Sequence, residues 1–328
     1  MRYKPLGHSC ISASVIGIGT WGISGWLWNG TDEAASIDAI HAAIDMGVNF
    51  IDTAPGYGLG YAEEITGKAI SGNRNKMVIA TKCGLVWHTE KGKEFFSEYG
   101  KPVNIYLHPD SIRYELEQSL RRLGTDYVDL YQTHFQDPTT PIEDTMATLL
   151  DLKKEGKIRA IGVSNISLTE LEEYQRYGVV NCGQERFSML DLGIQNTILP
   201  YCQKHGISMI AYSPICLGLL SGNMGPERTF EGDDYRRNNP RFSVQSRLYL
   251  AEMQSMYKHI AESRGLTLAQ LAIAWTISQP GISYALLGAR NRQQACENAF
   301  PSDIRLTDEE MTTINEAIKI HAHKIPPG

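Results

Sequence analysis

The chain has 328 residues, a length that suits either two domains of ordinary size or one α/β barrel. Apolar residues make up 42% of the sequence and charged residues 21%, which excludes a largely disordered or fibrous chain. The net charge of −6 argues against binding along a nucleic-acid backbone, because that requires a basic surface.

Eight short runs rich in β-branched and apolar residues alternate with longer amphipathic segments. Most of the runs are continuously apolar rather than alternating, which is typical of strands that are buried on both faces. We therefore predict eight strands, at residues 15–19, 49–52, 77–82, 128–133, 158–164, 179–185, 208–212 and 283–287.

Helical patterns lie between and after these runs. The segment from Pro141 to Lys154 is a clear example, because it opens with proline and acidic residues and closes with two lysines, as the helix dipole favours. The predicted helices cover residues 32–46, 111–123, 141–154, 169–176, 196–205, 244–264, 267–278, 293–299 and 308–321.

This alternation predicts parallel β/α units that close into a (β/α)8 TIM barrel, with residues 1–328 as one domain. The alternative is an open doubly wound sheet with a glycine-rich fingerprint after its first strand. Residues 17–22 do spell GxGxxG, but no helical pattern follows them, so we interpret the match as coincidental. Residues 84–108 and 213–243 are predicted as long loops at the C-terminal face of the barrel, where barrel enzymes build their sites.

Targeting and metal-binding signals are absent from the sequence. No apolar run approaches the roughly 18 residues that cross a bilayer, and no secretory signal opens the chain. The six cysteines form no CxxC pair and lie at no metal-ligand spacing. We therefore expect a cytoplasmic protein with reduced thiols, no metal site and no membrane or nucleic-acid partner.

Ionisable side chains recur where the predicted strands end. Asp52, Lys82 and His134 lie at the ends of the second, third and fourth strands, and Tyr57 follows Asp52 within a short loop. Each residue alone has an ordinary structural explanation, such as a turn, a solvated cation or a hydrogen-bonded histidine. In a barrel, however, the strand ends converge on one mouth, so the four groups together predict an active site.

Six segments resemble the aldo-keto reductases, in the same order along about residues 15–298. They read NFIDTAPGYG at 49–58, IATK at 79–82, VDLYQTH at 128–134, IRAIGVSN at 158–165, AYSP at 211–214 and GAR at 288–290. The chain is most similar to bacterial members with a long loop after the third strand. The resemblance implies that the protein uses NADPH to reduce small aldehydes or ketones to alcohols. Methylglyoxal-like dicarbonyls and sugars are examples of such substrates. NADH is expected at lower affinity.

The family's catalytic tetrad falls on Asp52, Tyr57, Lys82 and His134. The resemblance implies that Tyr57 donates a proton to the developing alkoxide while a neutral His134 orients the carbonyl oxygen. A phenol has a pKa of about 10, and we expect the ammonium of Lys82 to lower it. Asp52 is expected to keep that ammonium charged and in place.

The resemblance also implies where the cofactor binds. Ser164, Asn165 and Gln184 are expected to hold the nicotinamide carboxamide, and Tyr212 is expected to stack on the nicotinamide ring. Arg290 falls where relatives contact the 2′-phosphate of NADPH. The implied cofactor positions are Gly19, Thr20, Trp21, Asp52, Ser164, Asn165, Gln184, Tyr212, Ser213, Pro214, Leu217, Gly218, Leu219, Ser221, Gly288, Ala289, Arg290, Gln294, Glu297 and Asn298.

The expected partner is a small carbonyl substrate, with contacts from Trp21, Tyr57, Trp87 and His134. The sequence carries no signal of an oligomeric state. Two other functions are compatible with a barrel of this kind. One is a Schiff-base aldolase that uses Lys82 as nucleophile, and the other is a non-catalytic subunit that senses the cofactor. Tyr57, His134 and the cofactor positions count against the aldolase, and the complete tetrad favours turnover.

Overall fold

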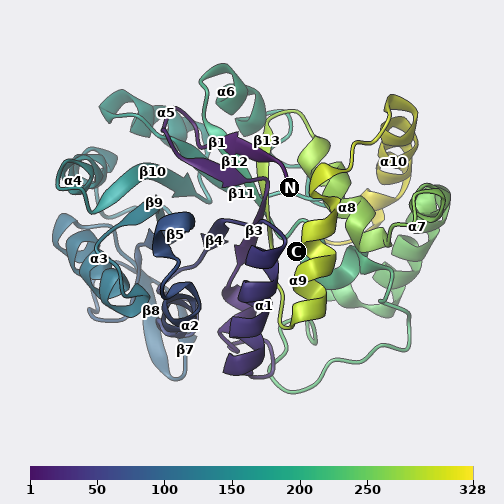
Figure 1. The fold of residues 1–328 in the computed structure, drawn as a ribbon, viewed down its shortest axis with the longest axis horizontal. Helices are drawn as coiled ribbons and strands as arrows, with labels where there is room; N and C mark the ends of the chain where they lie inside the picture. The colour runs from purple at the N-terminus through teal and green to yellow at the C-terminus, as the bar shows by residue number, and fades with distance from the viewer. Residues whose placement is uncertain (328) are drawn as a thin grey trace.

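In a computed structural model, which describes residues 1–327, eight parallel strands close into a barrel inside a ring of helices (Figure 1). β13 pairs with β3 and thereby closes the barrel. The predicted (β/α)8 fold is confirmed, and each strand boundary lies within three residues of its prediction. The barrel strands are β3 (Ile16–Gly19), β4 (Phe50–Asp52), β5 (Val78–Cys83), β9 (Val128–Thr133), β10 (Ile158–Ser164), β11 (Cys182–Arg186), β12 (Ser208–Tyr212) and β13 (Ile282–Leu287).

Ten α-helices lie around the barrel strands in residues 1–327. The nine predicted helices are all present, with ends displaced by at most two residues, and α7 packs against α10 outside the ring (Figure 1). The helices are α1 (Glu33–Asp45), α2 (Tyr61–Ile70), α3 (Pro109–Leu123), α4 (Ile142–Lys154), α5 (Leu168–Tyr177), α6 (Ile198–Lys204), α7 (Val244–Ser263), α8 (Leu268–Ser278), α9 (Arg292–Ala299) and α10 (Asp308–His321).

Helix α2 was not predicted from the sequence. It follows Gly60, which has a left-handed φ of 99°, and no side chain caps its first turn. Gly67 further weakens the helical pattern, since glycine costs about 1 kcal/mol relative to alanine inside a helix. A Cβ at Gly67 would lie 2.5 Å from the carbonyl oxygen of Arg122, so the glycine is needed for close packing on α3. Tertiary contact therefore outweighs the weak local preference.

The predicted loop at residues 84–108 is wrong in part, because it contains a three-stranded antiparallel sheet. Its strands are β6 (Leu85–Val86), β7 (Lys93–Glu98) and β8 (Lys101–Ile105), in the order β6-β8-β7. The pairing register shifts between Glu94 and Phe96, which makes Phe95 the extra residue of a β-bulge. A bulge and exposed charges interrupt the alternation that would have revealed β7.

The second predicted loop, residues 213–243, contains only two short 3-10 helices, η3 (Cys216–Ser221) and η4 (Pro240–Phe242). At the start of the chain, β1 (Tyr3–Pro5) and β2 (Ser12–Ser14) pair as a small antiparallel hairpin that was not predicted. Three-residue strands are too short to show a period, so sequence pattern alone misses them.

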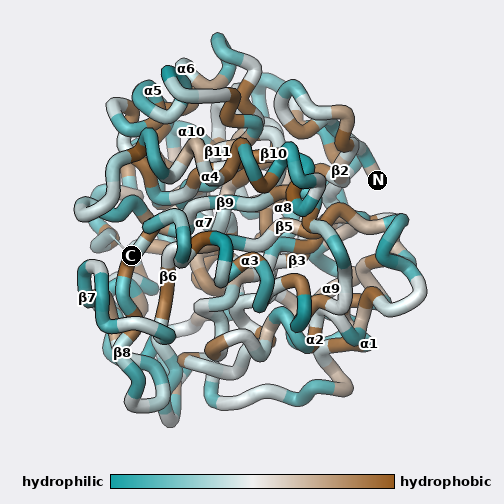
Figure 2. The backbone as a smooth tube through the Cα atoms, turned by 90° about the vertical axis from the view of Figure 1, so that its left-hand side faces the viewer, coloured by the Kyte–Doolittle hydropathy of each residue, from teal (hydrophilic) through white to brown (hydrophobic). Residues whose placement is uncertain are grey.

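Apolar side chains fill the inside of the barrel, including Phe50, Leu130, Ile210 and Tyr284, all of them fully buried. Figure 2 shows hydrophobic segments in the middle of the molecule near β9, β5 and β3, with β7 and β8 at its lower left edge. Within residues 1–327, no helix is long and apolar enough to cross a bilayer. The same residues bring together no cluster of His, Cys, Asp or Glu that could hold a metal ion.

Candidate active site

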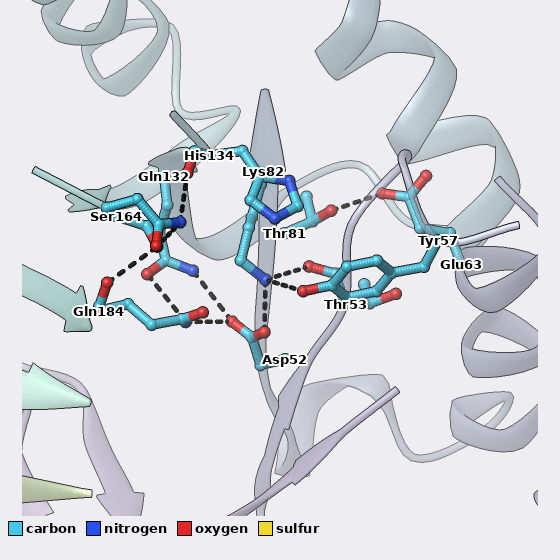
Figure 3. A network of polar contacts seen from close by, with 11 residues as sticks. Asp52, Thr53, Tyr57, Glu63, Thr81, Lys82, Gln132, His134, Ser164 and Gln184 are labelled. Carbon is cyan, nitrogen blue, oxygen red and sulfur yellow. Dashed lines mark hydrogen bonds and ion pairs between the residues drawn. The ribbon is translucent and has the colours of Figure 1, made fainter. Parts of the chain in front are cut away.

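The four predicted ionisable side chains meet at the C-terminal end of the barrel (Figure 3). Lys82 Nζ lies 2.5 Å from Asp52 Oδ1 and 3.2 Å from Tyr57 Oη, and it donates to the backbone carbonyl of Thr53 at 3.0 Å. The rings of Tyr57 and His134 meet edge to face, with their centroids 5.6 Å apart. The ends of strands β4, β5 and β9 and the loop after β4 thus bring the four side chains together, with Lys82 against Asp52 and Tyr57 and with Tyr57 against His134.

Lys82 is fully buried and carries its charge inside the protein. Burial opposes the charged form, but Asp52 and Tyr57 together raise the pKa of Lys82 above its ordinary value. An ammonium has three N–H donors, and here Asp52, Thr53 and Tyr57 accept all three. Since Lys82 donates to Tyr57 Oη, the hydroxyl hydrogen of Tyr57 must point elsewhere.

The net pKa of Tyr57 differs from the sequence-based expectation. Burial raises the pKa of Tyr57, the charge of Lys82 lowers it, and Asp52 raises it again, so that the net shift is upward. The expected effect of Lys82 is present, but the loss of solvation outweighs it. Tyr57 therefore keeps its proton at neutral pH and is available as a proton donor.

His134 is neutral at neutral pH. Burial, and then the nearby charge of Lys82, hold the pKa of His134 well below its ordinary value. A neutral imidazole retains one N–H, with which it can donate a hydrogen bond to a carbonyl oxygen. This agrees with the neutral state expected from the sequence.

Asp52 also binds two side-chain amides that tie the tetrad to the next strands (Figure 3). Gln132 Nε2 donates to Asp52 Oδ2 at 3.0 Å, and Gln184 Nε2 donates to the same oxygen at 2.8 Å. Sequence reasoning missed Gln132. A signal was available, because Gln132 precedes His134 by two positions and side chains two apart on a strand share a face.

The predicted carboxamide-binding residues are hydrogen-bonded to one another and, through Asn165, to His134. Ser164 Oγ donates to the backbone oxygen of Gln184 at 2.9 Å, and Asn165 Nδ2 donates to the backbone oxygen of His134 at 2.9 Å. Tyr212 Oη donates to Asn165 Oδ1 at 2.8 Å. Strands β10, β11 and β12 therefore bring Ser164, Asn165, Gln184 and Tyr212 next to the tetrad.

Two features of the mouth suit a bound polar group. Thr20 is fully buried beyond the end of β3, and its hydroxyl has no hydrogen-bond partner among residues 1–327. In the loop after β12, Ser213 and Leu217 both have a left-handed φ of 55°, and Gly218 has a φ of 87°. Left-handed backbone is costly for residues other than glycine and is concentrated in ligand-clamping segments. The left-handed backbone of the predicted pyrophosphate loop is compatible with the expected binding role.

The predicted adenosine-end residues form a separate group where β13 meets α9. The backbone N–H of Arg290 donates to Gln294 Oε1 at 2.9 Å, and Asn298 Nδ2 donates to the carbonyl of Gly288 at 3.0 Å. The Arg290 guanidinium donates to the carbonyls of Trp28 and Gly30 at 3.0 and 2.9 Å. Arg290 therefore also anchors the loop after β3.

The predicted substrate aromatics occupy two places. Trp21 meets Trp28 edge to face, with centroids 5.4 Å apart, and Tyr235 at 6.0 Å. Trp87 instead packs on the apolar cluster formed by Leu85, Val103 and Ile105 at the base of the inserted sheet. Tyr235 was missed because its loop has no periodic pattern to predict.

Phe95 is a further missed residue near the tetrad. Its ring centroid lies 4.7 Å from that of Phe135, whose own ring stacks on His134 at 5.3 Å. Phe95 is nevertheless 45% exposed. The bulge in β7 therefore presents an aromatic ring to solvent beside the residue that follows His134.

Comparisons with known proteins agree with this geometry. The model of the aldo/keto reductase family matches residues 15–319. The chain is 38% identical to aldo-keto reductase YhdN of Bacillus subtilis, over 97% of this chain and 94% of that protein. It is also 38% identical to an NADH-specific methylglyoxal reductase of Escherichia coli, over 96% and 98% of the two chains.

Solved structures of similar chains share the fold. The glycerol dehydrogenase AKR11B4 from Gluconobacter oxydans superposes with a TM-score of 0.89 at 35% identity, covering 99% of this chain and 98% of that one. The holo form of AKR11C1 from Bacillus halodurans superposes with a TM-score of 0.78 at 27% identity, covering 97% and 96%.

Proposed function

The chain belongs to the aldo/keto reductase family and is a nicotinamide-dependent carbonyl reductase, and we propose that Tyr57 is its proton donor and NADPH its preferred cofactor. The observation that carries the proposal is the line of contacts from Asp52 through Lys82 to Tyr57, beside a neutral His134. The substrates are small aldehydes and ketones.

Each side chain has a distinct part in the reaction. A nicotinamide held by Ser164, Asn165 and Gln184 would supply a hydride to the carbonyl carbon. His134 donates its N–H to the carbonyl oxygen and so fixes the substrate's orientation. Because Lys82 donates to Tyr57 Oη, the Tyr57 proton is directed away from Lys82 and passes to the developing alkoxide, which becomes the alcohol. Lys82 then stabilises the phenolate that remains.

Replacement of Tyr57 by phenylalanine tests the assignment. We expect Tyr57→Phe to lose about 10² to 10⁴-fold in turnover, since it removes a general acid, while cofactor affinity is retained. The measurements are cofactor oxidation by absorbance with a panel of carbonyls, and cofactor binding by fluorescence titration. Near-native turnover in the variant would show that another group donates the proton.

The preference for NADPH rests on Arg290, whose planar guanidinium suits a phosphate. Two of its five N–H groups reach the carbonyls of Trp28 and Gly30. A charged hydrogen bond is worth roughly 1.5–3 kcal/mol, so Arg290→Ala should raise KM for NADPH about 10 to 150-fold and barely change KM for NADH. Arg290→Gln is the control, because its amide can still donate to the two carbonyls.

Comparable wild-type affinity for NADH and NADPH would contradict the cofactor proposal. This comparison has a clear alternative outcome, since one relative at 38% identity is named NADH-specific. The aldolase alternative is disfavoured by Lys82 itself. A Schiff base requires a neutral and accessible amine, whereas Lys82 is fully buried, paired with Asp52 and raised in pKa.

A further inference from the structure

We propose that Gln132 is a positioning residue that couples the proton-donating side of the site to the side that holds the nicotinamide. The inference rests on the proposed function, because it concerns the same acid and the same cofactor. It assigns a role to a residue outside the predicted tetrad and outside the predicted cofactor set.

Gln132 lies between the two sides and touches both. Its Nε2 donates to Asp52 Oδ2 at 3.0 Å, and its Oε1 accepts from Gln184 Nε2 at 3.3 Å (Figure 3). The other oxygen of Asp52 binds Lys82. Gln132 is fully buried, so no solvent competes for these hydrogen bonds.

The charge of Asp52 determines how both amides are turned. An ionised carboxylate only accepts hydrogen bonds, so Gln132 and Gln184 must each present an NH2 group to Oδ2. Gln184 Nε2 therefore uses one hydrogen on Asp52 and the other on Gln132 Oε1. Gln184 then offers only its oxygen to a carboxamide, and that oxygen must accept from the carboxamide NH2. The orientation of the nicotinamide is thus linked to the ion pair that serves Tyr57.

A glycine on the neighbouring strand leaves room for the Gln132 side chain. On the neighbouring strand β10, a Cβ at Gly162 would lie 2.8 Å from Gln132 Cγ and 3.2 Å from the backbone oxygen of Cys182. Real Cβ contacts essentially never reach 2.8 Å, so only glycine at position 162 leaves Gln132 in this position.

Two substitutions separate positioning from packing. Gln132→Met keeps the volume but removes both polar contacts, so Asp52 Oδ2 loses one donor and Gln184 Nε2 loses one of its two acceptors. We expect cofactor affinity and kcat each to fall by about tenfold or more, at every pH, because hydrogen bonds to a charged group are among the strong ones. Gln279→Met is the matched control, since Gln279 is buried at the end of α8 and donates to the carbonyl of Trp275.

Gln132→Glu gives a signature that a purely structural role does not produce. When protonated, the introduced carboxyl group donates to Asp52 and accepts from Gln184, as the native amide does. When ionised, it places a second carboxylate beside Asp52, and the two charges repel. We therefore expect kcat and cofactor affinity of Gln132→Glu to approach wild type as pH falls, while Gln132→Met stays impaired throughout.

The measurements are Kd for NADPH by fluorescence and kcat against pH with a saturating carbonyl, alongside circular dichroism to verify folding. The inference is overturned if the wild type reduces carbonyls but Gln132→Met matches it, or if Gln132→Glu shows no recovery at low pH. If Gln132→Met does not fold, the pH profile of Gln132→Glu still decides. A wild type that oxidises neither cofactor would instead refute the proposed function.

Discussion

Asp52 and Lys82 form an ion pair that is almost completely removed from water. Lys82 is fully buried and Asp52 is 2% exposed, and every hydrogen of the ammonium is accepted within the protein. Removing one partner of a buried pair is costly because the remaining charge is left uncompensated. Breaking the pair should therefore destabilise the fold, independently of any effect on Tyr57.

Single and double substitutions of this pair should separate stability from catalysis. We expect Asp52→Asn to lower the free energy of unfolding by about 3–5 kcal/mol, since Lys82 loses its counter-charge. The double variant Asp52→Asn, Lys82→Met should recover most of that loss, because both charges are gone. Turnover should remain low in the double variant, since no ammonium is then left to stabilise the phenolate of Tyr57. Urea unfolding and cofactor oxidation measure the two properties.

The contrast between the variants is the decisive result. If the double variant were no more stable than Asp52→Asn alone, the destabilisation would come from lost packing rather than from an uncompensated charge. Lys68→Met is a suitable control, because Lys68 pairs with Glu33 at the exposed surface and such pairs contribute little.

The site residues that sequence could predict are those that end strands or lie in matched segments. Asp52, Lys82 and His134 belong to this group, and the barrel brings them together as expected. Gln132 was missed although it lies in the matched segment at 128–134, because it is inside a strand rather than at its end. Phe95 was missed because it lies in a bulge. The direction of the Tyr57 pKa shift could not be predicted from the sequence either, because it depends on a balance between burial and the distance to Lys82.

The inserted sheet β6-β8-β7 is the element that borders the tetrad on the side of His134. Phe95 contacts Phe135 and Phe96, and Phe96 in turn stacks on Trp26, with centroids 4.9 Å apart. Bulges re-aim side chains and are frequent beside active sites. We expect this row of rings to form a wall of the substrate pocket.

Phe95 and Trp87 should respond differently to truncation. Phe95→Ala should raise KM for bulky aryl carbonyls more than for small ones and leave Tm nearly unchanged, since the ring is 45% exposed. Trp87→Ala should lower Tm, because Trp87 packs on Leu85, Val103 and Ile105. Kinetics with a size series of carbonyls and thermal melts compare the two. An unaltered size profile in Phe95→Ala would place the wall elsewhere.

Among the helices and strands, those with a clear pattern of apolar residues were predicted from the sequence. Most of the barrel strands are continuously apolar because both of their faces are buried, and this pattern made them predictable. Helix α2 and the inserted sheet were not predicted, each for a different reason. α2 depends on the close approach of Gly67 to α3, and β7 loses its alternation at the Phe95 bulge.

In the molecule as a whole, the tetrad residues are not the only buried ionisable groups. Burial raises the pKa of Glu98 to about 7, of Glu185 to about 7 and of Glu115 to about 8. Glu115 accepts hydrogen bonds from the backbone N–H of Gly84, and Glu185 accepts one from that of Ile166. Glu115 and Glu185 thus fix the starts of the loops after β5 and β10, both of which border the site.

The raised pKa values predict how stability depends on pH. Between about pH 4.5 and 8, Glu115 holds its proton in the folded chain but loses it in the unfolded chain, so the folded state binds more protons. Stability must then fall as pH rises through this window, by at most about 1.4 kcal/mol per pH unit for each such group. Above about pH 8 the contribution of Glu115 is fully lost and the slope levels off.

Glu115→Gln should flatten this decline, because its amide oxygen can still accept from Gly84 and no charge needs to be buried. Thermal melts at intervals from about pH 5 to 9 measure the slope, with Tm of Glu115→Gln falling less than that of the wild type. Glu117→Gln on the same helix is the control, since Glu117 lies at the surface and pairs there with Lys157. Parallel pH profiles for the wild type and Glu115→Gln would mean that Glu115 is already ionised in the folded protein at neutral pH.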